Sequence, residues 1–510
     1  MNYLEIFSKV IAHCKEHGFI FPSSEIYDGL SAVYDYGQLG TELKRNLRES
    51  WWKTMTQFHD NIVGIDSAIL MHPTIWKASG HVDAFNDPLI DNKDSKKRYR
   101  ADQLIEDFLE KLLQKSIKET EKKALKEGWK PSDEAYQRFL GGNRDAQKHQ
   151  LFQSKYTVAM SNNDMVALRQ LIDDAGITDP ETGSKNWTEI RQFNLMFKTQ
   201  LGAMAESSQE LYLRPETAQG IFVNFLNVQK SGRMKIPFGI AQVGKAFLNE
   251  IVARQFIFRM REFEQMEMQF FIKPGTQKTW FEYWLQARYQ WHLSLGISSG
   301  RLRFKPHEKL AHYADAATDI EFMFPFGFKE LEGIHSRTDF DLSRHQEFSG
   351  KKIAYFDSDD QLSFVPFIVE TSVGLDRSVL AHLCNAYKEE EVPTAEAGES
   401  AIRTVLSFHP AIAPVKVAVF PLVKKDGLPE IATKIVADLR KRYLVTYEEK
   451  DTIGRRYRRQ DAKGTPFCVT VDNQTHEDQQ ITIRHRDSMR QERVAISQLN
   501  NYLEQNFESF

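Results

Sequence analysis

The spacing of apolar residues predicts the first elements of the chain. Residues 1–19 have the spacing of an amphipathic helix, so we expect a helix there rather than a cleaved leader. After Thr41, large apolar residues recur at every fourth position, at Leu43, Leu47, Trp51 and Met55. This spacing predicts a helix over 41–58. The next stretch, "NIVGIDSAILMHP", has the composition of a strand that ends at Pro73.

Changes in the pattern divide the chain into five segments. Residues 1–100 and 201–390 mix strand and helix patterns and are predicted to form the two parts of a core. Between them, 101–200 is charged and rich in helix-favouring residues, as in "IEDFLEKLLQKSIKETEKKALKEGW", and is predicted to be a mainly helical insertion. Prolines and charges mark 391–412 as a linker. Alternating strand and helix patterns predict a small α/β domain over 413–510.

Charged residues occur inside the predicted strands of the second core part. In "FIFRMREFEQMEMQF", every second side chain shares a face, and one face carries Arg259, Arg261, Phe263, Gln265 and Glu267. A solvent-facing antiparallel sheet also produces such alternation. Four further segments, "LRPE", "NE", "KELEG" and "ETSVGLDR", place charges within or at the ends of apolar strands. We therefore expect the five segments to converge on one polar cleft.

The charges of this predicted cleft indicate the kind of ligand. Arginines suit phosphates and carboxylates, because guanidinium is planar and stays protonated. The cleft would contain Arg214, Arg259, Arg261, Arg337 and Arg377. Its carboxylates would repel phosphate unless a divalent cation or a substrate ammonium group lies among them. These are Glu216, Glu250, Glu330 and Glu370. A nucleotide, Mg²⁺ and an amine-bearing substrate satisfy both sets. The sequence has neither GxxxxGK[ST] nor a GxGxxG after a strand, so side chains must hold the phosphates.

Composition narrows the class of protein. The 510 residues are 41% hydrophobic and 27% charged, which predicts two or three domains, and no apolar run is long enough to cross a membrane. Three distant cysteines without a CxxC pair argue against a disulfide scaffold and favour the cytoplasm. From Val415 to the end, 17 basic residues outnumber 14 acidic ones, which leaves a net charge of −6 for the rest. A mildly basic tail is compatible with a nucleic-acid contact.

The apolar groups of Trp51, Trp52 and 61–71 predict a two-fold dimer.

Several longer stretches are unusual enough to compare with known families. They are "GFIFPSSEIYDGLSAVYDYGQLG", "WKASGHVDAFNDPL", "LRPETAQGIFVNF", "REFEQME", "SRTDFDL", "VETSVGLDR" and "APVKVAVFPLV". In these stretches the chain resembles the class II aminoacyl-tRNA synthetases, and specifically the homodimeric glycyl-tRNA synthetases of bacterial type. The resemblance covers nearly all residues. It implies an α+β fold with an antiparallel sheet flanked by helices, followed by an α/β anticodon-binding domain. It also implies ATP with Mg²⁺, glycine and tRNA(Gly) as ligands, and transfer of glycine to the tRNA 3′ end.

The resemblance assigns roles to individual residues. Motif 1 of the class, at the dimer interface, would be the helix around 43–58 with the strand that ends at Pro73. Motif 2 would be a hairpin over 238–271, and motif 3 would be "GLDR" with its helix. The implied catalytic residues are Glu250, Arg259 and Arg377. Those implied to bind ATP are Asn249, Glu250, Phe258, Arg259, Met260, Arg261, Glu262, Phe263, Glu330, Leu331, Gly374, Leu375, Asp376 and Arg377, with Glu330 holding Mg²⁺ through ATP. Those implied to bind glycine are Arg100, Glu216, Phe263, Glu264, Gln265, Met266, Glu267, Glu370, Thr371, Ser372, Val373 and Gly374.

Leu248 departs from the family pattern. Members of the family ordinarily read "FRNE" where this chain reads "FLNE", so a leucine replaces an arginine that would contact the α-phosphate and the glycine carboxylate. Loss of one preorganised donor costs about 3–4 kcal/mol, or roughly 10²–10³ in rate. Three explanations stay open. Lys245 or Arg254 substitutes, the residue is a departure in an otherwise normal enzyme, or activation is lost.

Two other functions remain under consideration. The chain could be a non-enzymatic nucleic-acid-binding scaffold with a synthetase fold, an alternative that Leu248 favours and the retained ATP-site residues oppose. It could also be a synthetase for another small amino acid, such as alanine or serine. A glycine pocket must select by excluding a Cβ atom while carboxylates hold the ammonium group. The basic stretch 454–464, "GRRYRRQDAKG", fits either a contact with tRNA phosphates or a solvated loop.

Overall fold

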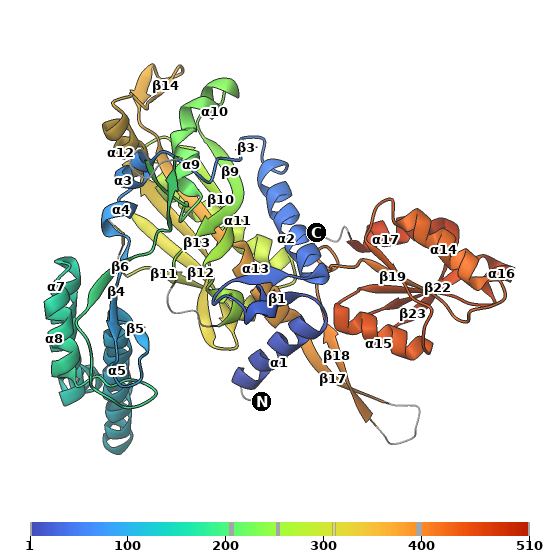
Figure 1. Cartoon of the computed structure of the whole chain (residues 1–510), viewed down its shortest axis with the longest axis horizontal. Helices are drawn as coiled ribbons and strands as arrows, with labels where there is room; N and C mark the ends of the chain where they lie inside the picture. Colours follow the sequence, from blue (N-terminus) through green and yellow to red (C-terminus); the bar gives the residue numbers. More distant parts are fainter. Residues whose placement is uncertain are drawn as a thin grey trace. The chain divides into compact units, whose positions relative to one another are not determined.

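The computed structural model describes residues 3–202, 209–250, 255–308, 310–311, 313–393 and 400–507. The chain forms two compact units (Figure 1). The first unit comprises Met1–Ser79, Lys198–Leu248 and Arg254–Phe510, and the second comprises Gly80–Phe197 with Asn249–Ala253. Among the described residues, no helix combines the length and the apolar character that crossing a membrane requires.

A seven-stranded sheet is the centre of the first unit. Its strand order is β11-β12-β13-β16-β10-β9-β3. Every neighbouring pair is antiparallel except β3 and β9. The strands span Leu302–Pro306 (β11), Ala316–Phe324 (β12), Gly327–Thr338 (β13), Phe367–Gly374 (β16), Glu262–Ile272 (β10), Phe238–Phe247 (β9) and Ile62–Gly64 (β3). The predicted antiparallel sheet is therefore confirmed, and the predicted hairpin over 238–271 consists of β9 and β10.

Helices cover one face of this sheet. They are α2 (Gln38–Thr56), α11 (Gln277–Ser294) and α13 (Leu375–Ala386). The apolar stripe that predicts α2 is buried in the same core as Met266, Met268 and Phe270 of β10. Even-numbered residues of β10 from Met266 onward therefore point at these helices, and odd-numbered ones point to the opposite face, which we call the cleft face. Because Trp51 is buried within this core, its side chain provides no evidence for a dimer.

Shorter elements complete the core of the first unit. The N-terminal helix is confirmed as α1 (Tyr3–Glu16). Helices α9 (Ala218–Val223) and α12 (Phe340–Ser349) contribute to a second apolar cluster with Phe238, Ile240 and Phe271. The remaining elements are β1 (Ile20–Pro22), η1 (Glu25–Tyr27), β2 (Tyr34–Tyr36), α3 (Pro73–Ala78), β7 (Lys198–Leu201), β8 (Gln209–Tyr212), α10 (Phe225–Ser231), η3 (Phe256–Phe258), η4 (Ser299–Arg301), β14 (Tyr355–Asp357) and β15 (Leu362–Phe364).

Two predicted strands are shorter than their sequence patterns suggest. The stretch before Pro73 contains only the three residues of β3, plus one isolated bridge between Leu70 and Leu213. Pro73 begins α3 instead of ending a strand, since proline suits the first turn of a helix. In the second case, residues 256–258 form a 3₁₀ turn, and β10 begins at Glu262. Phe256 has a φ of +58°, which is incompatible with an extended strand.

The second unit is mainly helical, as predicted for the insertion. Its long helices are α5 (Ala101–Glu127), α6 (Glu134–Gly142), α7 (Arg144–Ser161) and α8 (Met165–Ala175). They share a core with Ile90, Tyr99 and Trp187. The short helix α4 (His81–Ala84) and a three-stranded sheet of β4 (Asn86–Asp91), β5 (Arg98–Arg100) and β6 (Arg191–Asn194) complete it.

The C-terminal part of the first unit has its own sheet and core. The strand order is β20-β19-β21-β22-β23, with β19 parallel to β20 and β21. The strands are β19 (Val417–Pro421), β20 (Val445–Tyr447), β21 (Phe467–Val471), β22 (Gln480–His485) and β23 (Gln491–Ala495). Helices α14 (Leu428–Leu439), α15 (Ile453–Lys463), α16 (Thr475–Asp478) and α17 (Leu499–Phe507) and the turn η5 (Ile496–Gln498) complete this α/β arrangement. The stretch "GRRYRRQDAKG" lies mostly in α15, so it is a helix and not a loop.

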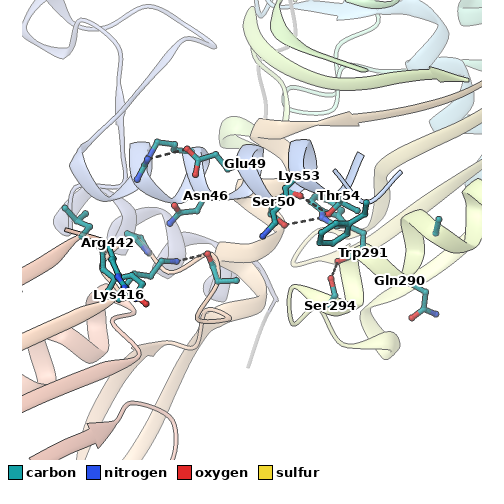
Figure 2. A pocket seen from close by; sticks show the side chains of 17 residues that line it. Asn46, Glu49, Ser50, Lys53, Thr54, Gln290, Trp291, Ser294, Lys416 and Arg442 are labelled. Atoms are coloured by element: carbon teal, nitrogen blue, oxygen red, sulfur yellow. Dashed lines mark hydrogen bonds and ion pairs between the residues drawn. The ribbon is translucent and has the colours of Figure 1, made fainter. Parts of the chain in front are cut away.

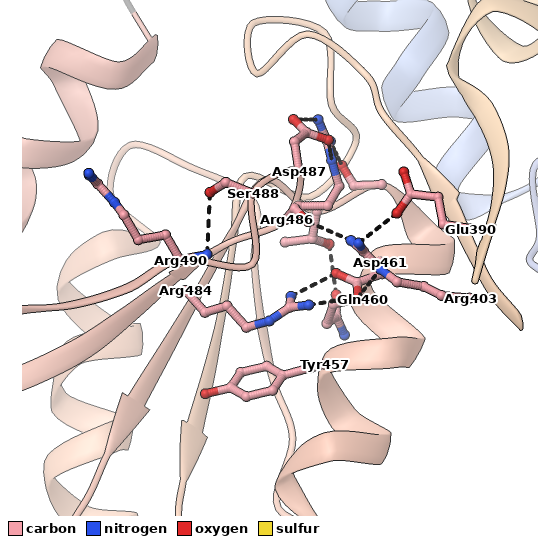
Figure 3. Close-up of polar contacts among 12 residues, drawn as sticks. Glu390, Arg403, Tyr457, Gln460, Asp461, Arg484, Arg486, Asp487, Ser488 and Arg490 are labelled. Carbon is pink, nitrogen blue, oxygen red and sulfur yellow. Dashed lines mark hydrogen bonds and ion pairs between the residues drawn. The ribbon is translucent and has the colours of Figure 1, made fainter. Parts of the chain in front are cut away.

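The segment predicted as a linker, 391–412, overlaps a β-hairpin. Strands β17 (Tyr387–Pro393) and β18 (Ser400–Leu406) pair antiparallel. Arg403 of β18 is buried and donates to Asp461 of α15 at 2.9 Å and to Glu390 of β17 at 2.9 Å. Arg484 of β22 binds the same aspartate through two nitrogens (Figure 3). The charge pairs therefore connect the hairpin to the C-terminal sheet.

Candidate active site

The cleft face of the central sheet holds a row of polar side chains. On β10 these are Gln265, Glu267 and Gln269, because their even-numbered neighbours fill the core. The register places Gln269 opposite Glu370 of β16, and Glu267 opposite Ser372. Gln269 donates to Glu370 at 2.7 Å. The predicted convergence of β10 and β16 is thus present, with carboxylates and amides side by side.

Two buried carboxylates of this row have opposite pKa shifts. Burial raises the pKa of Glu267 well above its usual value, and the nearby charges of Glu370 and Glu216 raise it further. Burial alone would also raise the pKa of Glu370, but Arg337 and His335 outweigh it, so the pKa of Glu370 is lowered. The row therefore carries an ionised carboxylate next to one that favours its proton. A cationic group placed between them would stabilise the ionised form of both.

A network of hydrogen bonds holds these carboxylates in place. Arg337 of β13 donates to Glu370 at 3.1 Å and to Asp341 of α12 at 2.8 Å. Gln219 of α9 donates to Asp341 at 3.1 Å and to Glu216 at 2.9 Å. Three predicted residues, Glu216, Glu267 and Glu370, thus belong to one polar network. Gln269 joins Glu267 to the network by a bond of 3.0 Å, and these bonds fix the positions of the three carboxylates.

Sequence reasoning missed several members of this network. Thr217 donates its hydroxyl to Glu267, and its backbone amide donates to Gln265 at 3.1 Å. Gln219 and Gln269 were not predicted either. The period-two alternation that identifies Gln265 and Glu267 also reaches Gln269, so that residue could have been found. The roles of Thr217 and Gln219 depend on where α9 lies and have no signal in the sequence.

Arg377 is the centre of a second group of predicted residues. Its guanidinium lies over the ring of Phe258, 4.6 Å from the centroid. It also pairs with the carboxylate of Glu330 at 3.2 Å. The charge of Arg377 lowers the pKa of Glu330 and outweighs the effect of burial. The Glu330 side chain is half exposed, so this carboxylate can reach a ligand.

Glu330 is suited to help hold Mg²⁺. A magnesium ion in a nucleotide site is commonly bound by one or two carboxylates together with the phosphates of the nucleotide. Glu330 offers one such carboxylate beside the guanidinium of Arg377. The donor set present here therefore fits the predicted ion.

Other predicted residues turn away from the cleft face. Buried side chains that pack in the core on the helix side belong to Met266, Leu331, Val373 and Leu375. Thr371, between Glu370 and Ser372 on β16, is fully buried and points the same way. A ligand in the cleft could meet only the backbone atoms of these residues.

Three predicted acidic residues are held by other parts of the protein. Asp376 is buried and accepts hydrogen bonds from Lys44 at 2.8 Å, from the amide of Glu264 at 2.7 Å and from Tyr36. The carboxylate of Glu264 lies 3.3 Å from Lys44, and Glu262 accepts from Lys245 at 2.6 Å. Asp376 therefore positions the start of α13 against β10. A direct contact of its carboxylate with ATP would require breaking these bonds.

The loop before β10 and the start of this strand carry several further predicted ATP-binding residues. Arg259 and Phe263 are half-buried, and Met260 is buried. The amide of Arg261 donates to Ala32, and its carbonyl accepts from the amide of Leu248 at 2.9 Å. Gly374 ends β16 opposite Gln265. This places the backbone of Leu248 beside the loop that contains Arg259.

Lys245 has another partner in the structure. It pairs with Glu264 in the register of β9 and β10, so both side chains project on the side away from Gln265. Its ammonium group is bound to Glu262 at 2.6 Å. The structure therefore gives no support to the substitution of the missing arginine by Lys245, and Arg254 lies outside the described residues.

Three predicted residues belong to the second unit. Arg100 pairs with Asp87 at 3.1 Å and with Asp102 at 2.6 Å, and the charge of Glu250 also acts on it. Asn249 donates its amide to the carbonyl of Leu195 at 2.8 Å. Arg100, Asn249 and Glu250 therefore form part of one compact unit, in which an arginine lies among carboxylates.

A separate cavity lies outside the cleft. It has a volume of about 670 Å³ and is lined by α2, α11 and residues between 411 and 444 (Figure 2). Lys416 lies at its edge and donates to the carbonyls of Pro410 and Ala411 at 2.8 Å and 2.6 Å. Burial lowers the pKa of Lys416 to about 7. None of the residues predicted to bind ATP or glycine lines this cavity.

Comparison with known proteins gives full-length matches. Three family descriptions match, namely "Glycyl-tRNA synthetase insertion domain 1" over 87–195, "tRNA synthetase class II core domain (G, H, P, S and T)" over 197–386 and "Anticodon binding domain" over 416–506. A glycine–tRNA ligase of Chlorobaculum tepidum is 51% identical over 97% of this chain and 99% of its own. Glycine–tRNA ligases of Acetivibrio thermocellus and Staphylococcus haemolyticus are each 48% identical, over 100% and 97% of both chains.

Proposed function

The chain belongs to the glycyl-tRNA synthetase family and is a glycine–tRNA ligase, and we propose that the cleft face of its central sheet is where glycine is activated. In the first step the carboxylate of glycine attacks the α-phosphate of ATP, forms glycyl-adenylate and releases pyrophosphate. In the second, a hydroxyl at the 3′ end of tRNA attacks the glycyl carbonyl and AMP leaves. Catalysis of this kind rests on positioning and on stabilising charge, and it needs no protein nucleophile.

The proposal for the glycine site rests on the buried carboxylates. Glu216, Glu267 and Glu370 belong to one network and would surround an ammonium group. Arg337 and Gln269 hold Glu370 from two sides, so the carboxylate is aimed before the substrate arrives. Glycine offers no side chain to bind. Selection must therefore come from close packing around its α-carbon.

The proposal for the ATP site rests on Arg377, Phe258 and Glu330. The guanidinium of Arg377 would meet the terminal phosphate, and Glu330 would hold Mg²⁺, which when bound neutralises part of the phosphate charge. Arg259 would help to cradle ATP, and the ring of Phe263 would stack on adenine. Glu250 and Asn249 would contact the nucleotide, and Arg100 would lie near the substrate. These roles come from the family resemblance and remain proposals residue by residue.

The organisation of the whole chain is also part of the proposal. We propose a catalytic core within 1–100 and 201–390, an insertion over 101–200 and an anticodon-binding domain over 413–510. Because the second compact unit already begins at Gly80, residues 80–100 belong with the insertion rather than with the core. The protein would be a cytoplasmic homodimer of the bacterial type. The scaffold alternative receives no support from relatives that are ligases over the full length.

Pyrophosphate exchange dependent on glycine tests the proposed site. The purified protein should exchange labelled pyrophosphate into ATP with glycine and not with alanine or serine. Glu370→Gln should lower this rate by about 10- to 100-fold, the size of one hydrogen bond to a charged group. Glu347→Gln is the matched control, because this exposed residue of α12 pairs only with Arg344 among the described side chains. Equal rates in both variants would contradict the placement of glycine beside Glu370.

A further inference from the structure

We propose that His307, Asp319 and His335 form a binding site for a divalent transition-metal ion. One ligand atom from each residue lies within 4.8 Å of the others. The Nε2 atom of His307 is 2.9 Å from Oδ1 of Asp319. Small side-chain movements would bring the three atoms to the separations that a shared ion requires. Glu330, which is proposed to act with Mg²⁺ and ATP, is not one of these three residues, although its charge acts on Asp319.

The strand register explains why these three residues meet. His335 of β13 is opposite Ala317 of β12, and the amide of His307, just after β11, donates to the carbonyl of Ala317. Asp319 is two residues beyond Ala317 and therefore shares its face. The small side chain of Ala317 lies between the two imidazoles and leaves space there. A cavity of about 340 Å³ is lined by His307, Ala317 and His335 together with Tyr313 and other residues.

The contact between His335 and Glu370 is a second observation that supports His335 as a ligand of the metal ion. Nδ1 of His335 lies 2.8 Å from Oε1 of Glu370. An ionised carboxylate only accepts hydrogen bonds, so Nδ1 carries a proton, and Nε2 presents a lone pair once an incoming ion displaces the proton from it. Histidines that bind metals in proteins almost always donate the other ring nitrogen to a carboxylate, a carbonyl or water. His335 already has this arrangement.

The donor set selects the class of ion. Two imidazoles and one carboxylate suit Zn²⁺ or Fe²⁺, whereas Mg²⁺ prefers oxygen ligands alone. Three protein ligands leave a further position for water or another small ligand. The site is reachable, since the side chains of His307, Asp319 and His335 are 32%, 15% and 19% exposed. An ion bound there would fix the ring of His335 and with it the hydrogen bond to Glu370.

Zinc titration of the whole protein tests this site. After treatment with a chelator, calorimetry with Zn²⁺ should show one binding event that Mg²⁺ neither produces nor competes for. Co²⁺ should give the visible absorption of a tetrahedral or five-coordinate ion. Asp319→Asn and His307→Gln should weaken this event by about tenfold or more. Glu370→Gln should weaken it by about 10- to 100-fold, as expected for the partner of a metal-binding histidine.

The controls separate this site from zinc held elsewhere. His476→Gln changes an exposed histidine of α16 whose ring contacts the carbonyl of Asp426, and it should leave the event unchanged. Melting temperatures without metal establish that each variant is folded. The proposal is overturned if the parent protein binds no Zn²⁺, or if folded Asp319→Asn and His307→Gln bind it as the parent does. Zinc binding is measured without glycine or ATP, so its outcome does not depend on glycine activation. The pyrophosphate assay reports glycine activation separately.

Discussion

Gly244 shows how one residue shapes the cleft face. A Cβ atom there would lie 2.2 Å from Nη2 of Arg214. The Arg214 guanidinium is buried and donates to the carbonyls of Lys245 at 2.6 Å and Ser67 at 2.9 Å. Burial lowers its pKa. The sequence suggests Arg214 as an anion ligand, but most of its donors hold backbone, and glycine at 244 provides the room for it.

Replacing Glu267 by glutamine should change how glycine binding depends on pH. Burial raises the pKa of Glu267, and a bound ammonium group favours its ionised form. The KM for glycine of the parent protein should therefore fall as pH rises through this pKa. Glu267→Gln should remove that fall and raise KM by about 10- to 100-fold at high pH. Steady-state exchange rates across pH measure both effects.

The same variant should make the protein more stable at neutral pH. A raised pKa in the folded state means that the contribution of Glu267 to stability is complete below the unfolded value of about 4.3 and is lost as pH rises. Glu267→Gln should therefore raise the melting temperature at neutral pH and change it little at low pH. An unchanged pH profile of KM together with an unchanged melting temperature would contradict the shifted pKa. Glu347→Gln is again the matched control.

Leu248→Arg should raise the rate of glycine activation. An arginine there would add a donor at the proposed position of the α-phosphate, worth roughly 10²-fold or more in exchange. The gain should appear mainly in the turnover number, because charge builds on this phosphate in the transition state. The KM for ATP should move less. If the parent protein already exchanges pyrophosphate fast and Leu248→Arg leaves the rate unchanged, another group has taken the role of the missing arginine. Lys245 is bound to Glu262 on the other face.

At the scale of elements, β10 shows why alternation predicts a site and not its boundaries. From Glu262 to Ile272 the odd positions face the cleft and the even ones from Met266 onward enter the core. The same alternation extends back to Phe256, where the structure has a 3₁₀ turn with a positive φ. Backbone conformation in that turn depends on contacts such as Arg261 with Ala32, which are distant in sequence.

The β17–β18 hairpin depends on one buried aspartate for its connection to α15. Asp461→Asn should destabilise the C-terminal part by about 3–5 kcal/mol, because Arg484 would then be a buried charge without its carboxylate and Arg403 would keep only Glu390. Denaturant unfolding followed by circular dichroism measures this. Asp438→Asn is the control, since an exposed pair such as that of Asp438 with Lys441 contributes little to stability. A similar effect in the two variants would mean that the buried network adds little.

At the scale of the whole molecule, the proposed ATP and glycine residues all precede the C-terminal sheet. Removing residues 414–510 should leave glycine-dependent exchange largely intact and abolish efficient charging of tRNA. Arg403 would lose Asp461, so the shortened chain should also carry Arg403→Gln, with the same substitution in the full chain as its control. Comparable loss of exchange and charging in a shortened chain that is still folded would contradict the proposed division of functions.

The sequence by itself determined the elements whose signal is local. The fourth-residue spacing of α2, the alternation of β10, the helical insertion and the C-terminal strands all follow from side-chain periodicity, which depends only on neighbouring residues. The motif stretches also led to the family and to the carboxylates of the cleft. Their pattern identified Glu267, Glu370, Glu330 and Arg377 without coordinates.

Only the tertiary structure decided which of these residues face the cleft and what holds them. Asp376 and Thr371 carry polar groups in predicted motifs, yet one is bound by Lys44 and the other points into the core. Gln219 and His335 gain their partners across 122 and 35 residues of sequence. The physical reason is that strand pairing and helix docking bring together groups whose distance in sequence carries no pattern.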